Sequence, residues 1–332
     1  MNFPFPVVVC DVGGTNCRVA AQASAGAPLL LLGSLKTSDF AGLGHAIQSV
    51  TANAPMRPRS VIACGAGPVE DGRILKLTNA PWIMDGPKVA QDLRLEAGLL
   101  LNDFEAQALS LPALRPEWLH PIGSPIGEVS GPKAILGPGT GLGIGGLFEA
   151  EGKLVALASE ACHIGFAPEN PEEERLWPHL EKAHGRITTE SVLSGVGMER
   201  LHRARLMAES RDPGHLSAAE ITGNALANRQ SEEALTVGLY WRLIGRFAGD
   251  IAITFKATGG VTLAGGILPR IAALLDATAF RAAFEAKAPV SRLAQSIPTQ
   301  LIIHSDSVLG GMAAIAGTPQ RYAIDYNNRA WI

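Results

Sequence analysis

The feature that most constrains this chain is a glycine turn that follows an apolar run near the N-terminus. Residues 7–12 are apolar enough for a buried strand, and Gly13, Gly14 and Thr15 follow them before a second apolar stretch begins at Arg18. Backbone without side chains can press its N–H groups against an anion. The pattern therefore predicts a hairpin turn that holds phosphate, with an ordinary tight β-turn as the alternative.

A second loop of the same kind lies in the middle of the chain. The apolar run 134–136 leads into Gly-Pro-Gly-Thr-Gly-Leu-Gly at 137–143. Two strand-to-glycine loops that each carry a threonine suggest one phosphate chain held from two sides. The chain has no P-loop motif, and the second loop lies between two expected strands, so it fits a hairpin better than a dinucleotide-binding turn.

Length and charge narrow the class of protein. The 332 residues correspond to two domains at roughly 150 residues each. The net charge is −3 without blocks of like charge, so a nucleic-acid partner, which requires a basic face, is not expected. The apolar runs are too short to span a membrane, and the N-terminus lacks the positive region of a signal peptide. The four cysteines form no CxxC pair, which fits reduced thiols in a cytoplasmic protein.

Strand and helix signals alternate along the chain, which predicts an α/β fold with a mixed sheet. Strands are expected at 7–12, 18–22, 29–35, 60–65, 73–78, 98–101, 133–137, 142–149, 153–158, 261–264 and 301–304. Helices are expected at 41–53, 104–111 and 232–257, after 265 and from 310, with a charged helical insertion at 170–230. The helix at 232–257 shows the clearest period, an apolar residue every fourth position from Leu235 to Phe255, with Gly259-Gly260 as its stop signal.

Asn102 and Asp103 follow three leucines where an expected buried strand gives way to a helix. Reacting groups in α/β proteins lie at the carboxyl ends of strands, so Asp103 could accept the proton of a hydroxyl nucleophile. The alternative is structural, because Asn102 with Glu105 matches a capping box. The two roles are compatible, since an N-cap position also holds the carboxylate rigidly.

A second polar pair, Glu160 and His163, follows the strand expected at 153–158. The two residues are three positions apart, so in a turn their side chains could face one ligand. A carboxylate with an imidazole suits the vicinal hydroxyls of a sugar. The alternatives are a plain surface turn and a zinc site, for which the further ligands at set spacing are missing. Glu190 is a third candidate, whose alternative is a helix-start acid favoured by the helix dipole.

One more glycine turn, Gly265-Gly266, follows the strand expected at 261–264. It could let a nucleotide base or ribose approach the backbone, with a phosphate near a helix N-terminus. A Gly-Gly turn alone is weak evidence for such a site.

Six segments, taken in order, resemble the bacterial ATP-dependent glucokinase family of the hexokinase–actin superfamily. The similarity spans roughly residues 7 to 315, and a set of ordered motifs is more specific than any one of them. The segments are 11–16, 101–106, 137–143, 160–168, 193–195 and 264–267.

The resemblance implies two ribonuclease-H-like α/β domains of the actin/hexokinase type flanking a cleft. The smaller domain would take residues 1–113 and 311–332, and the larger one 114–310. The family also implies a homodimer that phosphorylates glucose in the cytoplasm.

The resemblance also implies the site. Glucose would be bound by Asn102, Asp103, Glu160, His163 and Glu190, with Asp103 as the general base for the 6-hydroxyl. ATP would be held by Cys10, Asp11, Val12, Gly13, Gly14, Thr15, Gly139, Thr140, Gly265 and Gly266. Mg²⁺ would bridge the phosphates, mostly through water, with no residue assigned as a direct metal ligand.

The chain departs from the family pattern at Cys10, where relatives often carry glycine. It also lacks the CxCGxxGCxE zinc motif of the repressor–open-reading-frame–kinase group, which argues against that group and against a zinc requirement. The alternatives are a kinase of another hexose such as mannose or fructose, a kinase that uses polyphosphate as its donor, or a sugar-responsive binding protein. Such a regulator usually carries a helix-turn-helix before the first glycine loop, and here that loop begins by residue 10.

Overall fold

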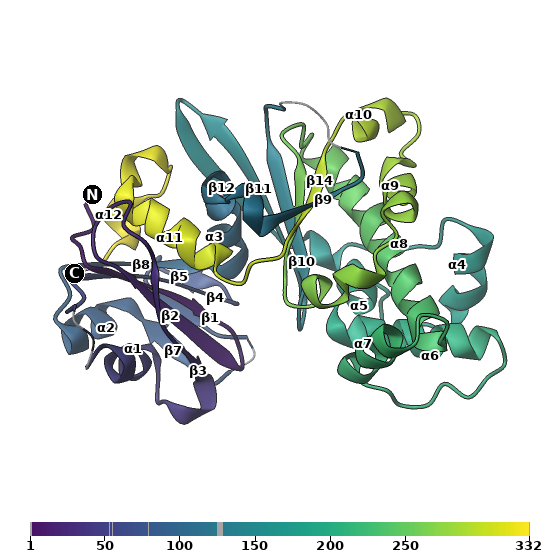
Figure 1. Cartoon of the computed structure of the whole chain (residues 1–332), viewed down its shortest axis with the longest axis horizontal. Helices are drawn as coiled ribbons and strands as arrows, with labels where there is room; N and C mark the ends of the chain where they lie inside the picture. Colours follow the sequence, from purple (N-terminus) through teal and green to yellow (C-terminus); the bar gives the residue numbers. More distant parts are fainter. Residues whose placement is uncertain (1, 53, 55, 79, 125–128, 332) are drawn as a thin grey trace. The chain divides into compact units, whose positions relative to one another are not determined.

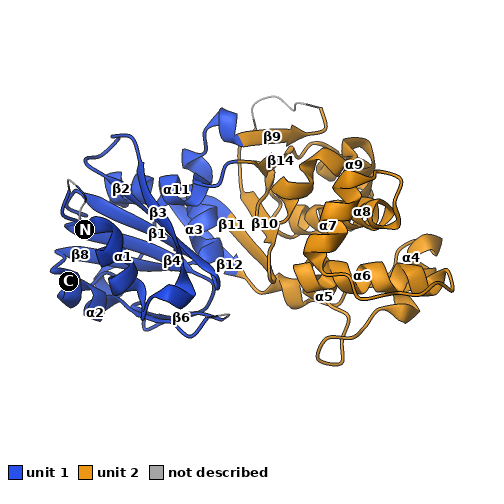
Figure 2. Cartoon of the chain, turned by 60° about the horizontal axis from the view of Figure 1, so that its bottom comes forward, with its two compact units in different colours: residues 1–118, 147–158, 304–332 blue, residues 119–146, 159–303 orange. Residues whose placement is uncertain are grey.

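The structure is a computed structural model that describes residues 2–52, 54, 56–78, 80–124 and 129–331. The chain forms two compact units (Figure 2). Unit 1 contains Met1–Trp118, Leu147–Ala158 and His304–Ile332, and unit 2 contains Leu119–Gly146 and Ser159–Ile303. Both combine strands and helices, so the predicted α/β class is confirmed. The domain boundaries expected from the sequence stay a prediction.

Unit 1 is built on a five-stranded sheet of order β3-β2-β1-β4-β8. Its strands are β1 (Val7–Val12), β2 (Asn16–Gln22), β3 (Leu30–Lys36), β4 (Ser60–Gly65) and β8 (Ala97–Asn102). Strand β2 pairs antiparallel with both β3 and β1, whereas β1, β4 and β8 are parallel to one another. Val12 pairs with Gly65, and Gly65 with Asn102. The glycine turn after β1 and the Asn102–Asp103 segment therefore lie at the same edge of this sheet.

Helices cover both faces of the unit 1 sheet (Figure 1). The helices are α1 (Leu43–Thr51), α2 (Gly86–Leu93), α3 (Asp103–Ser110), α11 (Ser307–Gly317) and α12 (Tyr326–Arg329), and a small sheet consists of β5 (Val69–Glu70), β6 (Ile74–Lys76) and β7 (Ile83–Asp85). The apolar faces of α1 and α2 pack on one side, and α3 and α11 lie on the other. Gly311 of α11 allows α3 and α11 to approach closely, because a Cβ at Gly311 would lie 2.1 Å from Cβ of Ser110 in α3.

The second large sheet has six strands in the order β12-β11-β10-β13-β14-β9. They are β9 (Leu119–Ile122), β10 (Lys133–Pro138), β11 (Leu142–Ala150), β12 (Lys153–Ser159), β13 (Val261–Leu263) and β14 (Thr299–Ile302), and residues 147–158 are counted with unit 1. Strands β10, β13 and β14 are parallel, and β9 runs antiparallel to β14. The carboxyl ends of β10 and β13 therefore place the two remaining glycine loops side by side.

Seven α-helices of the described chain belong to unit 2: α4 (Pro171–Leu176), α5 (Thr189–Leu193), α6 (Gly195–Ala208), α7 (Ala218–Ala227), α8 (Glu232–Thr254), α9 (Ala277–Glu285) and α10 (Ser291–Gln295). Helix α8 is the centre of the core and carries the fully buried Tyr240, Trp241 and Phe247. The apolar stripe expected along α8 is incomplete at its start, because Leu235 is 54% exposed. Neighbouring helices cover most other sides of α8.

Several expected boundaries are corrected. Helix α1 ends at Thr51 rather than at 53, a residue outside the described part of the chain, and α8 ends at Thr254 rather than at 257. The strand expected at 73–78 is only Ile74–Lys76, and the one expected at 301–304 is β14 at Thr299–Ile302. A 3₁₀ helix at Leu268–Leu274, with Pro269 in its first turn, replaces the helix expected after 265.

The four cysteine thiols are free and buried, three in unit 1 and Cys162 in unit 2. Burial raises the pKa of the Cys10 and Cys64 thiols well above the ordinary value, and that of Cys162 to about 12. These thiols are therefore protonated at neutral pH and pack as small apolar side chains.

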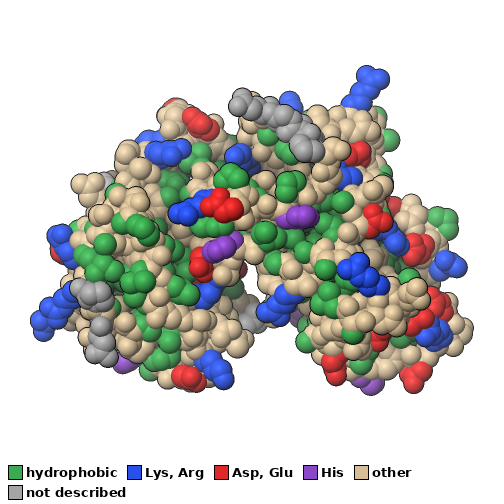
Figure 3. Space-filling view, in the orientation of Figure 1, with side chains coloured by type: hydrophobic (Ala, Val, Ile, Leu, Met, Phe, Trp, Pro, Cys, Tyr) green, Lys and Arg blue, Asp and Glu red, His purple; other side chains and the backbone are tan. Residues whose placement is uncertain are grey.

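Basic and acidic side chains are interspersed on the face shown in Figure 3, in keeping with the net charge of −3. Among the helices that the structure describes, none has the length and apolar character needed to cross a bilayer.

Candidate active site

The glycine turn between β1 and β2 presents its backbone to solvent. The N–H of Gly13 donates to the carbonyl of Asn16 (2.8 Å), and Thr37 binds the turn twice, through its hydroxyl to the carbonyl of Gly14 (2.8 Å) and through its N–H to the carbonyl of Thr15 (2.9 Å). The hydrogen bonds described leave the N–H groups of Gly14 and Thr15 free; Thr15 is exposed and Gly14 is half-buried. Such a turn fits an anion.

The other predicted phosphate-binding residues of this segment differ in their surroundings. The side chains of Cys10 and Val12 are buried in the core, so only their backbone could take part in a site. The Asp11 carboxylate is partly exposed, pairs with Arg18 and accepts a hydrogen bond from the Cys64 thiol (3.6 Å). Arg18 lies 3.7 Å from Asp306 as well. Carboxylate oxygens are the donors that Mg²⁺ prefers, so Asp11 fits an ion carried in with phosphates.

Asn102 caps helix α3, as its sequence predicts. Its Oδ1 accepts the N–H groups of Phe104 (2.9 Å) and Glu105 (3.2 Å), and Glu105 Oε2 accepts the N–H of Asn102 (3.3 Å). The Asn102 amide also donates to the carbonyl of Gly67 (3.1 Å). The capping box is thus confirmed, and it fixes the first turn of the helix on which Asp103 lies.

The pKa of Asp103 is raised to about 6. Burial of the carboxylate is the main cause, the N–H of Phe104 acts in the opposite direction, and the negative charge of Asp11 adds to the increase. A carboxylate with this pKa is ionised at pH 7 and is a stronger base than an exposed aspartate.

Three sugar-binding candidates come together in unit 2. His163 ends a 3₁₀ turn that begins at Ala161, and its Nε2 lies 3.5 Å from Glu160 Oε2. Its Nδ1 lies 3.9 Å from Oε1 of Glu190, and Glu190 is in the first turn of α5. The predicted helix-start position of Glu190 is confirmed, and it coexists with the contact to His163. All three side chains are at least partly exposed.

Glu190 also ties this cluster to the second glycine loop. Its Oε2 accepts the N–H of Leu142 (2.9 Å), and a Cβ at Gly141 would lie 2.5 Å from the same oxygen. At the start of α6, the N–H of Gly195 donates to the carbonyl of Gly139 (2.9 Å). The loop that contains Gly139 and Thr140 is therefore held by α5 and α6.

The third glycine turn packs directly on the second. Gly265 has φ +85°, and a Cβ there would lie 2.3 Å from the carbonyl oxygen of Pro138. A Cβ at Gly137 would lie 2.5 Å from the backbone of Ala264. These two glycines let the ends of β10 and β13 touch through their backbones, which places Gly139, Thr140, Gly265 and Gly266 along one edge of the sheet.

Glu160, Cys162 and His163 are the described residues whose ligand atoms lie close enough together to hold a metal ion, within 4.8 Å of one another. The cluster supplies three ligand atoms, one fewer than the four protein ligands of a structural zinc site.

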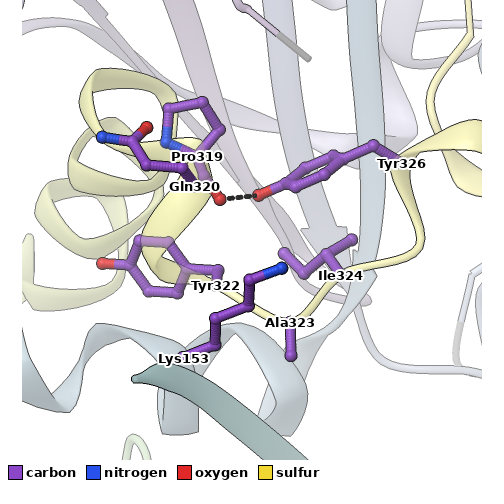
Figure 4. A pocket seen from close by; sticks show the side chains of 7 residues that line it. All are labelled: Lys153, Pro319, Gln320, Tyr322, Ala323, Ile324 and Tyr326. Carbon is purple, nitrogen blue, oxygen red and sulfur yellow. Dashed lines mark hydrogen bonds between the residues drawn. The ribbon is translucent and has the colours of Figure 1, made fainter. Parts of the chain in front are cut away.

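The sequence-predicted site residues do not line the cavity of about 280 Å³ in unit 1 (Figure 4). It lies between Lys153 and residues 319–326, where the Tyr326 hydroxyl donates to the carbonyl of Pro319 (3.0 Å). Thr37, Arg18 and Arg329 also support the site and were not predicted from the sequence. Only Arg18 had a local signal, its place directly after the glycine turn.

A sequence model of the glucokinase family matches residues 8–319. The chain belongs to this family. It is 39% identical over 332 residues to the glucokinase of Allorhizobium ampelinum, with 99% of this chain and 97% of the relative covered. It is 37% identical over 329 residues to the glucokinase of Rhizobium etli, with 99% and 96% covered.

The fold is similar to the crystal structure of a glucokinase from an Antarctic psychrotroph, with a TM-score of 0.83 and 28% identity. The similarity covers 94% of this chain and 99% of the other. The membership predicted from the six motifs and the hexokinase-type α/β fold class are thus confirmed.

Proposed function

We propose that this protein is an ATP-dependent glucokinase, which transfers the γ-phosphoryl group of ATP to the 6-hydroxyl of glucose and releases glucose 6-phosphate and ADP. Relatives named glucokinase match the chain over almost its whole length, which supports the activity. One structural observation carries the mechanism: Asp103, a half-buried carboxylate held rigidly at the end of a parallel strand, has its pKa raised to about 6.

Asp103 acts as the general base. Attack by the sugar 6-hydroxyl on the γ-phosphorus forms the new P–O bond and breaks the bond to the β-phosphate, and the hydroxyl proton passes to the carboxylate. Phosphoryl transfer depends mainly on positioning and on neutralising charge, and the capping box supplies the positioning of this group.

Asn102, Glu160, His163 and Glu190 bind the hydroxyls of glucose together with Asp103. Carboxylates accept hydrogen bonds from hydroxyls, and the imidazole and amide can donate or accept. The contacts of His163 with both glutamates support this assignment, because they hold the three side chains in one cluster.

The glycine turns bind ATP. The free N–H groups of Gly14 and Thr15 support phosphate binding by the segment from Cys10 to Thr15, in which Cys10 and Val12 contribute backbone only. Gly139 and Thr140 bind the phosphates as well, and Gly265 and Gly266 border the adenosine. Asp11 would help to hold a Mg²⁺ ion bound with the nucleotide, and such an ion would supply charge neutralisation of the phosphates. The protein acts in the cytoplasm as a homodimer.

One coupled assay tests the proposal. Glucose 6-phosphate formation is measured with glucose, and ADP release with mannose, fructose and N-acetylglucosamine, each with ATP or polyphosphate as donor. We expect glucose with ATP to give the highest kcat/KM. A higher kcat/KM with another hexose would make that hexose the substrate, and a higher value with polyphosphate would make polyphosphate the phosphoryl donor. Sugar binding without turnover would indicate a binding protein.

A further inference from the structure

The C-terminal segment of unit 1 is anchored beside the strand that leads to Asp103. Trp331 is 2% exposed and exchanges backbone hydrogen bonds with Gly98 of β8 in both directions (2.8 and 3.1 Å). Its indole fills the space above two glycines, since a Cβ at Gly98 would lie 2.1 Å from the ring and one at Gly86 2.4 Å. The segment thus adds one bridge to the edge of the sheet at β8.

Arg329, at the end of α12, reaches from this segment to α3. Its guanidinium holds Glu105 through two hydrogen bonds, Nη1 to Oε1 (2.6 Å) and Nη2 to Oε2 (2.9 Å). Nη2 also donates to the carbonyl of Leu100 in β8 (3.0 Å). Both charged side chains are mostly buried, 21% and 16% exposed, so solvent screens the pair less than it would a surface pair.

Glu105 is the N3 residue of the capping box that holds Asn102 and Asp103. Its Oε2 accepts two hydrogen bonds, one from Arg329 Nη2 and one from the N–H of Asn102. The arginine therefore fixes the rotamer that closes the capping box. Without it, Glu105 is free to turn towards water, and the first turn of α3 loses one of its two reciprocal hydrogen bonds.

We propose that Arg329 is a positioning residue for the reaction, which acts through Glu105 and Asn102 to hold the Asp103 carboxylate at the start of α3. The inference rests on the proposed role of Asp103 as general base. It assigns a function in turnover to a residue 224 positions away from the glutamate that it binds.

The titration of Asp103 provides a specific readout. The charged and titratable groups around it are Asp11 with its partners Arg18 and Asp306, the Cys64 thiol, and Glu105 with Arg329. The helix-start N–H groups lower the pKa of Asp103, so loss of the capping box removes a stabilising interaction of the carboxylate. Loss of the arginine charge acts in the same direction.

The test compares Arg329→Ala, Arg329→Lys and Arg73→Ala with the wild-type chain in the glucose and ATP assay from pH 5 to 8.5. Arg73 is the matched control, because it donates to the carbonyl of Asn328 (3.0 Å) and holds the same segment without touching the capping box. We expect Arg329→Ala to lower kcat about tenfold, leave KM for ATP unchanged and move the acid limb of kcat/KM up by roughly half a pH unit. Arg329→Lys should recover part of kcat, since it keeps the charge but not the two-point geometry.

Hydrogen–deuterium exchange over residues 100–110 provides a readout independent of turnover. Exchange should become faster in Arg329→Ala and stay unchanged in Arg73→Ala. If Arg329→Ala does not fold, Arg329→Met replaces it, because it keeps a long side chain but neither the charge nor the hydrogen-bond donors.

Unchanged kcat, pH profile and exchange in Arg329→Ala would overturn the inference, as would an equal loss of kcat in Arg73→Ala. An Asp103→Asn variant in the same series separates the two proposals. Full turnover of that variant would reject Asp103 as the base, whereas its inactivity beside a normal Arg329→Ala would reject only the positioning role.

Discussion

Replacing Asp103 by asparagine should remove turnover and stabilise the fold at the same time. Burial raises the pKa of this carboxyl from 3.8 to about 6. The folded protein therefore favours the protonated acid, and ionisation at higher pH acts against folding. Asparagine keeps the shape and the acceptor for the helix-start N–H groups but carries no charge.

The magnitude follows from linkage. A folded-state pKa about two units above the unfolded value corresponds to about 3 kcal/mol of unfolding free energy. Because the pKa is raised on folding, this stability is present below the unfolded value near pH 4 and is lost as the pH rises through about 6. Asp103→Asn should thus be more stable than the wild-type chain by up to about 3 kcal/mol at pH 7.5, and by only about 1 kcal/mol at pH 4.5.

Urea unfolding at the two pH values measures the stability difference. The coupled assay should show kcat lowered about 100-fold or more, with KM for glucose little changed, as expected for loss of a general base. Asp92→Asn is the matched control, because Asp92 is an exposed residue of α2 paired with Lys88, and it should change stability by less than about 0.5 kcal/mol. Equal stability of Asp103→Asn and wild type at pH 7.5 would refute the buried-charge argument, and undiminished kcat would place the base elsewhere.

Three further substitutions test other parts of the site and core. Gly265→Ala adds a Cβ 2.3 Å from the carbonyl of Pro138 at positive φ, so KM for ATP should rise at least about tenfold with KM for glucose nearly constant in steady-state kinetics; equal changes in both constants would argue against an adenosine role. Glu190→Gln keeps an acceptor for the N–H of Leu142 but removes the charge beside His163, so KM for glucose should rise roughly fivefold or more; an unchanged KM would exclude a sugar contact. Arg246→Ala leaves the buried Glu173 unpaired and should lower the free energy of unfolding in urea by about 3–5 kcal/mol; a loss below about 1 kcal/mol would contradict the burial of this pair.

Much of the fold was predictable because its strands are continuous apolar runs. The strands β1, β4 and β8 are buried on both faces, so their sequences stand out against the glycines and acids that follow. Short elements at the surface were missed, among them β7, in which Ile83 is 60% exposed, and the four-residue helix α12. Their stability comes from tertiary contacts rather than from a periodic pattern.

Helix α8 shows how tertiary packing alters a correct periodic pattern. The four-residue repeat identified the helix, and its members Leu239, Leu243, Phe247 and Ile251 are buried. Burial also extends beyond the stripe, because neighbouring helices cover other faces of this central helix. Leu235 belongs to the repeat but lies one turn from the helix start, where it is exposed.

The candidate site divides in the same way. The capping box at 102–105 and the spacing of Glu160 and His163 are local patterns, and the structure confirms the first and brings the second pair together with Glu190. The contact of Arg18 with Asp306 joins residues far apart in sequence, and so does that of Arg329 with Glu105. A single sequence contains no signal for such pairs.

Because all four thiols are buried, their chemical labelling can report local unfolding of the chain around them. A maleimide or iodoacetamide should react with them mainly after the surrounding chain has opened, because all four are buried in the folded state. Cys162 records this event in unit 2, and Cys10, Cys17 and Cys64 record it in unit 1. Mass spectrometry of labelled peptides would therefore time the unfolding of each half of the molecule separately, without an engineered probe.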